Sequence, residues 1–240
     1  MPYHAACMTI DGPAYGIIVA AGRSERMNGV DKVFTELVGR PLVAWTLAAF
    51  RNTEGVDGVV VVAASENVSR MRDLVAEWRF NNVINVVPGG AQRQDSVRAG
   101  IEAADGASIV AVHDAARPLV EAALIARGIA LARESGAALC AVPARDTVKE
   151  VDGDPPTVRA TYDRDRIWLA QTPQVFERAL LLRAHREAAS AATDDAALVE
   201  ALGHDVRVYA GDARNIKITT RDDLLIAETL LRRRFEENGV

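Results

Sequence analysis

Short apolar runs rich in valine and isoleucine alternate with longer amphipathic segments along most of the chain. Continuous apolar runs of this length are typical of strands buried on both faces, and the longer segments have the 3.6-residue period of helices. The pattern predicts strands at residues 15–20, 58–63, 83–87, 108–113, 137–143, 205–209 and 215–219, and helices at 41–51, 67–79, 93–104, 121–134, 177–189, 194–202 and 221–235. This alternation predicts an α/β fold: a Rossmann-like single domain whose mostly parallel, mixed sheet is covered by helices on both faces.

Residues 145–166 depart from this pattern. Two short arms flank the turn sequence Gly-Asp-Pro-Pro at 153–156, which predicts a protruding β-hairpin. The arms are too polar to pack on themselves, and an isolated hairpin is marginally stable in water. The segment is therefore either a plain surface hairpin or an arm laid on another subunit.

Composition narrows the class of protein. A chain of 240 residues with 49% apolar residues can bury a core as one domain, and a net charge of −5 argues against a nucleic-acid-binding surface. No apolar run approaches the roughly 20 residues of a membrane span. The two cysteines, Cys7 and Cys140, lack metal-ligand spacing, which indicates a reduced, cytoplasmic chain. Residues 1–13 do not have the pattern of a signal peptide, and we expect a loose tail before a domain at 14–240.

The loop after the first predicted strand combines small residues with cations. Ala20-Ala21-Gly22-Arg23-Ser24 is followed by Arg26 and Lys32. Exposed backbone amides beside arginine and lysine suit a polyanion such as a triphosphate. The alternative is a tight strand-to-helix connection with solvated charges. The loop lacks the glycine spacing of dinucleotide sites and of P-loops, which removes support for dehydrogenase and ATPase functions.

Two glycines follow the third predicted strand. Gly89 and Gly90 allow close backbone approach, and the helix that Arg93 opens directs positive potential toward an anion. A plain loop with a helix cap, containing Ser96, is the alternative.

The fourth predicted strand ends at His113 and Asp114. A carboxylate at a strand end suits Mg²⁺, which usually takes one or two carboxylates plus phosphate oxygens. The alternative is a surface ion pair between Asp114 and Arg117. His113 is either a catalytic base or, as in most such cases, a packed or backbone-bonded histidine.

Further polar residues occur late in the chain. Alternation along the predicted strand at 215–219 would place Lys217 and Thr219 on one face. Thr193 is placed to cap the helix that follows it, and a substrate contact is the alternative.

These segments, taken in order, resemble the 2-C-methyl-D-erythritol 4-phosphate cytidylyltransferase family of the non-mevalonate isoprenoid pathway. The resemblance spans the chain from Tyr15 to about Leu231. It rests on eight motifs: Ala20-Ala21-Gly22 with Arg26-Met27 and Lys32, Gly89-Gly90 with Arg93 and Ser96, His113-Asp114-Ala115-Ala116-Arg117-Pro118, Arg145-Asp146-Thr147 with Lys149, Asp163-Arg164 with Trp168, Gln171-Thr172-Pro173-Gln174, Thr193-Asp194, and Asn215-Ile216-Lys217-Ile218-Thr219.

The resemblance implies transfer of a cytidylyl group from CTP to methylerythritol phosphate with release of pyrophosphate. It implies Mg²⁺ as the cofactor, held by Asp114, and a homodimer in which the hairpin arm completes the neighbour's site. The implied catalytic residues are Arg26, Lys32, Arg164 and Lys217. The implied CTP-binding residues are Ala20, Ala21, Gly22, Arg23, Ser24, Gly89, Gly90, Arg93, Ser96, Ala115 and Arg117. The implied residues for the second substrate are Asp114, Thr147, Arg164, Thr172, Thr193, Lys217 and Thr219.

This chain departs from the family pattern at two positions. Ser24 stands where glycine is common, and Asp31 stands where proline usually precedes the lysine. Two other functions remain open: a cytidylyltransferase for another polyol phosphate such as ribitol 5-phosphate, and a non-catalytic nucleotide-binding module.

Overall fold

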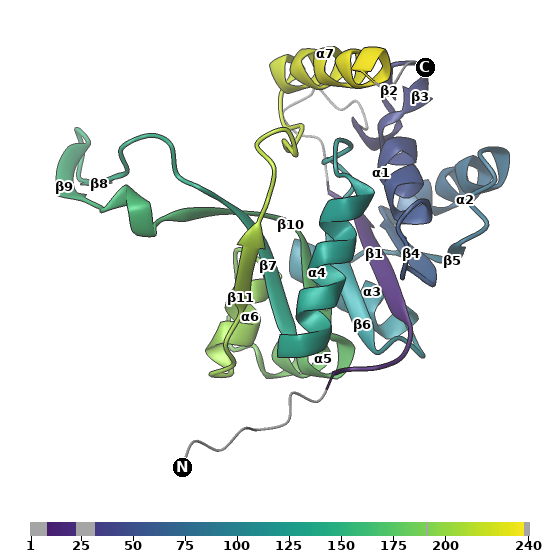
Figure 1. Ribbon diagram of the computed structural model, residues 1–240, viewed down its shortest axis with the longest axis horizontal. Helices are drawn as coiled ribbons and strands as arrows, with labels where there is room; N and C mark the ends of the chain where they lie inside the picture. The colour runs from purple at the N-terminus through teal and green to yellow at the C-terminus, as the bar shows by residue number, and fades with distance from the viewer. Residues whose placement is uncertain (1–8, 23–31, 191, 238–240) are drawn as a thin grey trace.

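A seven-stranded sheet forms the centre of the molecule in the computed structural model, which describes residues 9–22, 32–190 and 192–237 (Figure 1). The strand order is β11-β7-β10-β6-β1-β4-β5, and β10 runs antiparallel to both of its neighbours while the other pairs are parallel. The strands are β1 (Ala14–Ala20), β4 (Gly58–Ala63), β5 (Val83–Pro88), β6 (Ile109–Asp114), β7 (Ala137–Pro143), β10 (Trp168–Glu177) and β11 (Arg207–Ala210). The predicted mixed α/β sheet is confirmed.

Helices cover both faces of the sheet because side chains alternate along its strands. On β1, Ile17 packs on one face and the adjacent Ile18 on the other, and both are fully buried. The face of Ile18 is covered by α1 (Leu42–Arg51), α2 (Val68–Glu77) and α4 (Ala122–Ser135). The face of Ile17 is covered by α3 (Arg93–Ala103), α5 (Arg178–Glu187) and α6 (Asp195–Ala201).

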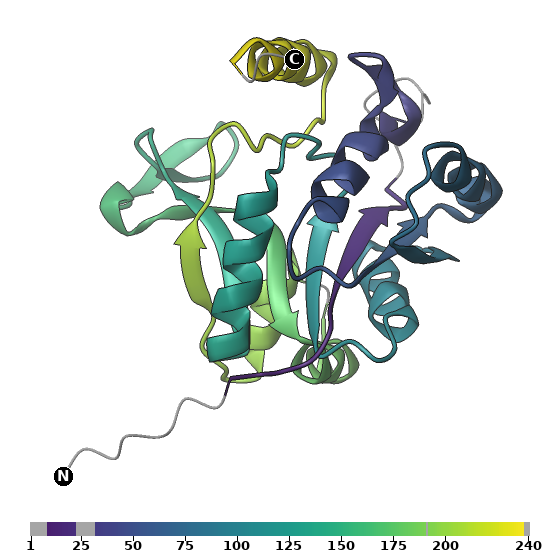
Figure 2. The ribbon, with the colours of Figure 1, turned by 45° about the vertical axis from the view of Figure 1, so that its right-hand side comes forward.

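A smaller apolar cluster lies beyond the carboxyl ends of the parallel strands. Helix α7 (Arg221–Glu237) packs there on β2 (Glu36–Leu37), which pairs with β3 (Arg40–Pro41), and Ile218 is buried in the same cluster. The arrowheads of β1 and β6 point toward this side of the molecule in Figure 2. Short 3₁₀ turns complete the described elements: η2 (Lys32–Phe34), η3 (Ser65–Asn67) and η4 (Arg164–Arg166).

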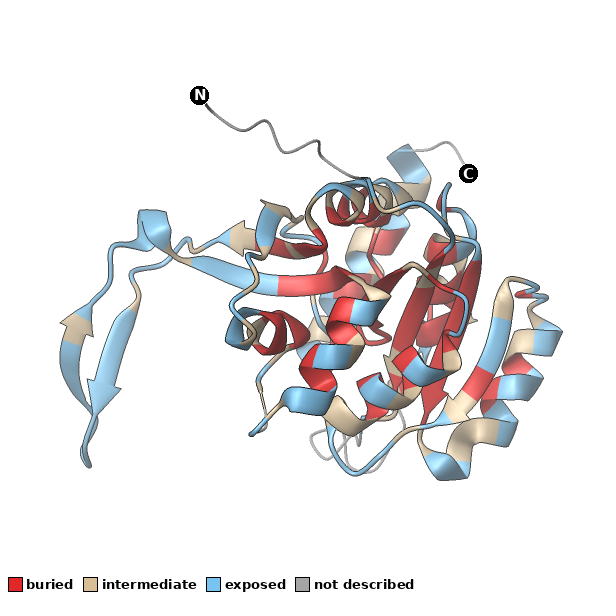
Figure 3. Cartoon of the chain, turned by 90° about the horizontal axis from the view of Figure 1, so that it is seen from below, coloured by how far each residue is buried: buried red, intermediate tan, exposed pale blue. Residues whose placement is uncertain are grey.

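The predicted hairpin is present as β8 (Lys149–Asp152) and β9 (Thr157–Thr161). Figures 1 and 3 show it projecting from the body as an arm, with exposed residues along nearly all of its length. It carries apolar side chains into solvent, since Val151 is 56% and Val158 57% exposed. Nothing in its own chain covers these side chains among the described residues.

Two local predictions are wrong, and one strand is missing from the predicted set. Residues 215–219 do not form a strand; this irregular segment is held by the hydrogen bond from the Ile218 N–H to the Ala116 carbonyl. Strand β10 was not predicted, because its sequence contains a proline and two glutamines. The cap of α6 is Asp194, whose side chain accepts from the Ala197 N–H, and not Thr193, which is exposed.

Candidate active site

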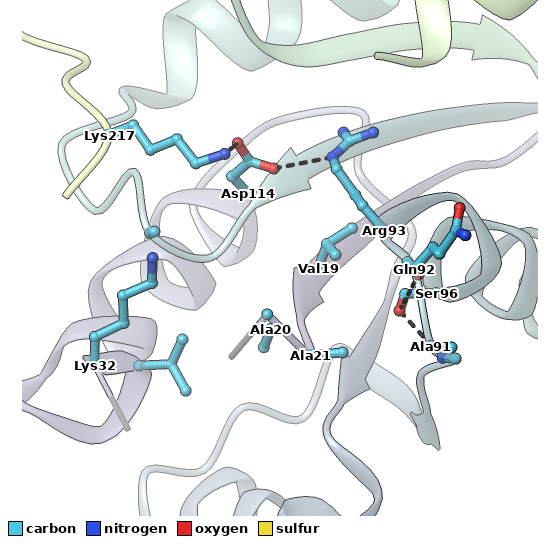
Figure 4. Close-up of a pocket in the computed structure, with 14 residues that line it drawn as sticks. Val19, Ala20, Ala21, Lys32, Ala91, Gln92, Arg93, Ser96, Asp114 and Lys217 are labelled. Carbon is cyan, nitrogen blue, oxygen red and sulfur yellow. Dashed lines mark hydrogen bonds and ion pairs between the residues drawn. The ribbon is translucent and has the colours of Figure 1, made fainter. Parts of the chain in front are cut away.

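A cavity of about 590 Å³ opens at the carboxyl ends of β1, β5 and β6, where ligands bind in open α/β sheets (Figure 4). Its volume lies within the range of roughly 300–1,000 Å³ typical of small-molecule sites. Segments far apart in the sequence meet here: the loop after β1, turn η2, the loop from β5 into α3, the end of β6, and residue 217. The predicted site residues that line it are Ala20, Ala21, Gly22, Lys32, Gly90, Arg93, Ser96, Asp114 and Lys217.

The two small-residue loops touch each other because Gly89 has no side chain. A Cβ placed on Gly89 would lie 2.5 Å from the Ala21 Cβ and 2.6 Å from the Ser96 Oγ. Ser96 is almost fully buried, and its Oγ accepts from the Gly90 N–H at 3.2 Å and donates to the Gln92 carbonyl at 3.1 Å. The glycine-rich loop is therefore tied to the first turn of α3 and packed against the loop after β1.

Cations surround the Asp114 carboxylate. The Lys217 Nζ lies 2.8 Å from its Oδ2, the Arg93 Nε lies 3.6 Å from its Oδ1, and the Arg117 Nε lies 3.8 Å from its Oδ2. Figure 4 shows Lys217 and Arg93 reaching Asp114 from opposite sides of the cavity. The sequence alternative of an Asp114–Arg117 surface pair is wrong in one respect, because both side chains are nearly buried.

These charges control the ionisation of the site. Burial alone would raise the pKa of Asp114, but Lys217, Arg93 and Arg117 lower it from 3.8 to about 2. Burial alone would lower the pKa of Arg93, but the carboxylates of Asp195 and Asp114 raise it above its ordinary value. Asp114 is therefore ionised at every physiological pH, as an anion that already has cationic partners.

A chain of hydrogen bonds holds Asp114 from behind. Its backbone N–H donates to the Thr172 Oγ1 at 3.1 Å, and that hydroxyl lies 3.0 Å from the His113 Nδ1. The Arg117 carbonyl can only accept, so His113 Nε2–H donates to it at 3.2 Å, and Nδ1 of the neutral ring accepts from the Thr172 hydroxyl. This arrangement needs a neutral ring, and burial lowers the pKa of His113 to about 4. His113 is thus a backbone-bonded histidine, and Thr172 supports Asp114 from outside the cavity.

The segment around Lys217 is fixed on both sides of that residue. The side-chain Nδ2 of buried Asn215 donates to the Thr172 backbone carbonyl at 2.8 Å. The backbone carbonyl of Asn215 accepts from the Arg117 Nη1 at 2.7 Å. On the other side, the N–H of buried Ile218 donates to the backbone carbonyl of Ala116, just after the end of β6. Lys217 between them remains exposed enough to reach the cavity.

The remaining predicted residues lie elsewhere. Gly89, Ala115, Arg117 and Thr172 surround the cavity without lining it, and Thr219 binds the Asp223 carboxylate at the start of α7. Thr193 also does not line the cavity. Thr147 and Arg164 lie at the base of the exposed arm, and the Arg164 Nη1 donates to the Arg145 carbonyl at 3.1 Å. Arg23, Ser24, Arg26 and Asp31 lie outside the described residues.

Sequence reasoning missed one charged residue beside the site. Asp195 is almost fully buried, and its Oδ2 lies 2.8 Å from the Arg93 Nη1. In the sequence it resembles an ordinary acidic residue in the first turn of a helix. Its position just before an apolar helical stretch gave no sign that it would be buried.

Comparison with known proteins identifies the family of this chain. The model of the IspD family, described as 2-C-methyl-D-erythritol 4-phosphate cytidylyltransferase, matches residues 15–233. The chain belongs to this family. A protein of that name from Dehalococcoides mccartyi is 44% identical over 217 residues, which are 90% of this chain and 95% of the relative. The bifunctional enzyme IspD/IspF of Desulforudis audaxviator is 48% identical over 90% of this chain and 56% of its own length.

Solved structures of IspD proteins share the fold. The 2-C-methyl-D-erythritol 4-phosphate cytidylyltransferase of Thermus thermophilus has a TM-score of 0.74 and 36% identity, covering 90% of this chain and 98% of that one. The 4-diphosphocytidyl-2C-methyl-D-erythritol synthase of Anaerococcus prevotii has a TM-score of 0.81 and 28% identity, covering 92% and 96%. The resemblance found in the sequence is therefore confirmed at the level of the family.

Proposed function

We propose that this protein transfers the cytidylyl group of CTP to 2-C-methyl-D-erythritol 4-phosphate. Membership of the IspD family supports the choice of substrates. The observation that carries the proposal is the cationic ring around Asp114 at the carboxyl ends of the strands, beside two loops of small residues. Such a site can accept two polyanions whose phosphates must approach each other.

In the reaction, an oxygen of the acceptor phosphate forms a bond to the α-phosphorus of CTP. The bond from that phosphorus to the bridging oxygen breaks, and pyrophosphate leaves. A phosphomonoester has a second pKa of about 6, so the attacking oxygen is already ionised near neutral pH and needs no general base. Catalysis then rests on positioning and on cations around the reacting phosphorus.

The residues divide between the two substrates. Ala20 to Gly22 and the loop from Gly89 to Ser96 receive the nucleotide, with Arg93 and Lys32 directed at its phosphates. Lys217 exchanges its ion pair with Asp114 for the acceptor phosphate, and the released carboxylate accepts hydrogen bonds from hydroxyl groups of the acceptor. By family resemblance, Arg26 also contacts the triphosphate.

A magnesium ion fits Asp114 if Lys217 turns toward the acceptor. Within the described residues, no group of three or more histidine, cysteine, aspartate or glutamate side chains could hold a metal. One carboxylate is sufficient for Mg²⁺ when phosphate oxygens and water supply the other ligands. Bound there, the ion would offset negative charge on the triphosphate.

We further propose that two copies of this chain associate through the hairpin arm in the cytoplasm. Besides Val151 and Val158, the arm and its base expose Tyr162, Trp168 and Leu169, between 45% and 53%. Thr147 and Arg164, which the resemblance assigns to the acceptor, lie on this arm and not in their own chain's cavity. A partner's cavity is the site that they could complete. Across the described residues, no helix is long and apolar enough to span a membrane.

A pyrophosphate-release assay tests the transfer. Purified protein should release pyrophosphate only when CTP, Mg²⁺ and methylerythritol phosphate are all present, and ribitol 5-phosphate in its place should give a much lower kcat/KM. Equal turnover of ribitol 5-phosphate would overturn the assignment of the acceptor. Calorimetric binding of CTP without turnover on either acceptor would indicate a nucleotide-binding module.

Mixed dimers test the arm. Arg164→Ala and Lys217→Ala are each expected to inactivate the homodimer. If Arg164 acts in the partner's site, a heterodimer of the two variants has one intact site, and a statistical mixture regains about a quarter of wild-type activity. No recovery in verified heterodimers would place Arg164 in its own chain's site or outside the mechanism.

A further inference from the structure

Asp195 is a buried carboxylate that the proposed reaction does not use. Its side chain is 1% exposed, at the first residue of α6, and its backbone N–H donates to the Gln174 Oε1 at 3.1 Å. A buried charge is costly unless it is paired and hydrogen-bonded. Two side chains face it: Arg93 forms an ion pair at 2.8 Å from Oδ2 without hydrogen-bond geometry, and His185 is hydrogen-bonded at 3.0 Å from Oδ1.

Arg93 consequently lies between two carboxylates. Asp195 holds its Nη1 at 2.8 Å from behind, whereas Asp114 is 3.6 Å from its Nε at the cavity. The shorter contact is to the more deeply buried partner. An arginine side chain has several rotatable bonds, and its guanidinium would otherwise sample many positions or close on Asp114.

His185 supplies a hydrogen bond to Asp195 and leaves the carboxylate charge for Arg93. Its Nε2 faces Asp195, while its buried Nδ1 has no hydrogen-bond partner among the described residues. A buried N–H without an acceptor costs more than a bare ring nitrogen, so the neutral ring with the proton on Nε2 fits this site. In that form His185 donates to Oδ1 and does not compete electrostatically with the guanidinium at Oδ2.

We propose that Asp195, oriented by His185, is a positioning residue that holds the Arg93 guanidinium at the wall of the cavity, ready for the nucleotide phosphates. This inference rests on the proposed function for the identity of the nucleotide. Without Asp195, Arg93 turns to the nearest remaining carboxylate, Asp114, and is withdrawn from the phosphates. CTP binding then weakens, while the reacting groups themselves are unchanged.

The test is calorimetric CTP binding and steady-state kinetics on isosteric variants of the full chain. Asp195→Asn should weaken CTP binding about tenfold with kcat changed less than threefold, and Arg93→Gln should weaken it at least as much. The double variant should bind no more weakly than Arg93→Gln alone, because Asp195 acts only through Arg93. Glu200→Gln, an exposed carboxylate-to-amide change on the same helix, is the matched control and should bind CTP like wild type.

A pair of variants at His185 provides a second, independent measurement if Asp195→Asn fails to fold. His185→Leu should weaken CTP binding severalfold, and His185→Gln should restore most of it because its side-chain amide can donate to Asp195. Wild-type affinity in folded Asp195→Asn, or multiplying effects in the double variant, would overturn the inference. A wild-type protein that binds CTP but transfers nothing would refute the proposed function alone, since the CTP affinities would still decide the role of Asp195.

Discussion

Replacing Asp114 with asparagine removes the anion on which three cations converge. The change keeps the shape of the side chain but leaves Lys217, Arg93 and Arg117 facing one another without their common partner. The low pKa of Asp114 gives the scale of the effect: the difference between 3.8 and about 2 corresponds to roughly 2.5 kcal/mol. Because the Lys217 side chain is 41% and that of Arg93 31% exposed, solvent screens part of this energy. We expect Asp114→Asn to lower the free energy of unfolding by about 2 kcal/mol at pH 7.

The sign of the pH dependence follows from the same pKa. A carboxylate whose pKa is lowered by folding stabilises the protein at pH values above its pKa in the unfolded chain. This contribution is lost as the pH falls through its pKa in the folded protein. For Asp114 that window lies between about pH 4 and pH 2. The difference between wild type and variant should therefore be complete at pH 7 and reduced to about half near pH 3.

Urea denaturation at both pH values, with a matched control, measures these differences. Glu121→Gln removes a carboxylate that is 43% exposed and pairs with Arg234 at 2.9 Å, and such surface pairs contribute at most about 1 kcal/mol. An Asp114→Asn effect below about 0.5 kcal/mol at pH 7, or one no larger than the control's, would show that the cations are well solvated without the carboxylate. The account of the site as a compensated charge cluster would then be wrong.

Three further predictions concern stability and turnover. Gly89→Ala should lower the free energy of unfolding, measured by urea denaturation, by about 1–3 kcal/mol and raise the KM for CTP, because its Cβ overlaps the facing loop. Gly22→Ala, whose Cβ meets no described atom within 4 Å, should lower the free energy of unfolding less. Burial lowers the pKa of His113 to about 4, so between pH 6.5 and 4 the wild-type unfolding free energy should fall by about 3 kcal/mol more than that of His113→Asn; parallel curves would contradict this. Lys217→Ala should reduce kcat/KM for the acceptor at least tenfold in the pyrophosphate assay, and a wild-type value would remove Lys217 from the mechanism.

The strands that could be predicted are those whose own residues carry the signal, without help from tertiary contacts. Runs such as Gly58–Ala63 are apolar throughout because both of their faces are buried. The turn residues at 153–156 predict the hairpin in the same local way. Strand β10 was missed because Gln171, Thr172 and Gln174 are polar yet buried, and only tertiary partners satisfy them. Pro173 also argued against a central strand, and the register shift between Ala170 and Gln174 is where the sheet accommodates it.

The site divides in the same way. Small residues and cations at strand ends are local signals, and the structure brings several of them, such as Ala20, Arg93 and Lys217, to one cavity. The false strand at 215–219 came from an alternation of polar and apolar residues that has another cause, since Asn215 and Ile218 are anchors for Lys217. Asp195 could not be predicted, because its importance depends on Arg93, which is 102 residues earlier in the chain.

The place of β10 in the sheet has a consequence for how the chain folds during synthesis. Strands β1, β4, β5 and β6 all precede residue 115, and they can pair with one another before the rest of the chain has been made. The free edge of β6 is then an open row of backbone hydrogen-bonding groups until β10 emerges more than 50 residues later. Half-made chains on neighbouring ribosomes could pair through this edge. The sheet is closed there only when the last residues of β10, which follow the arm, insert between β6 and β7.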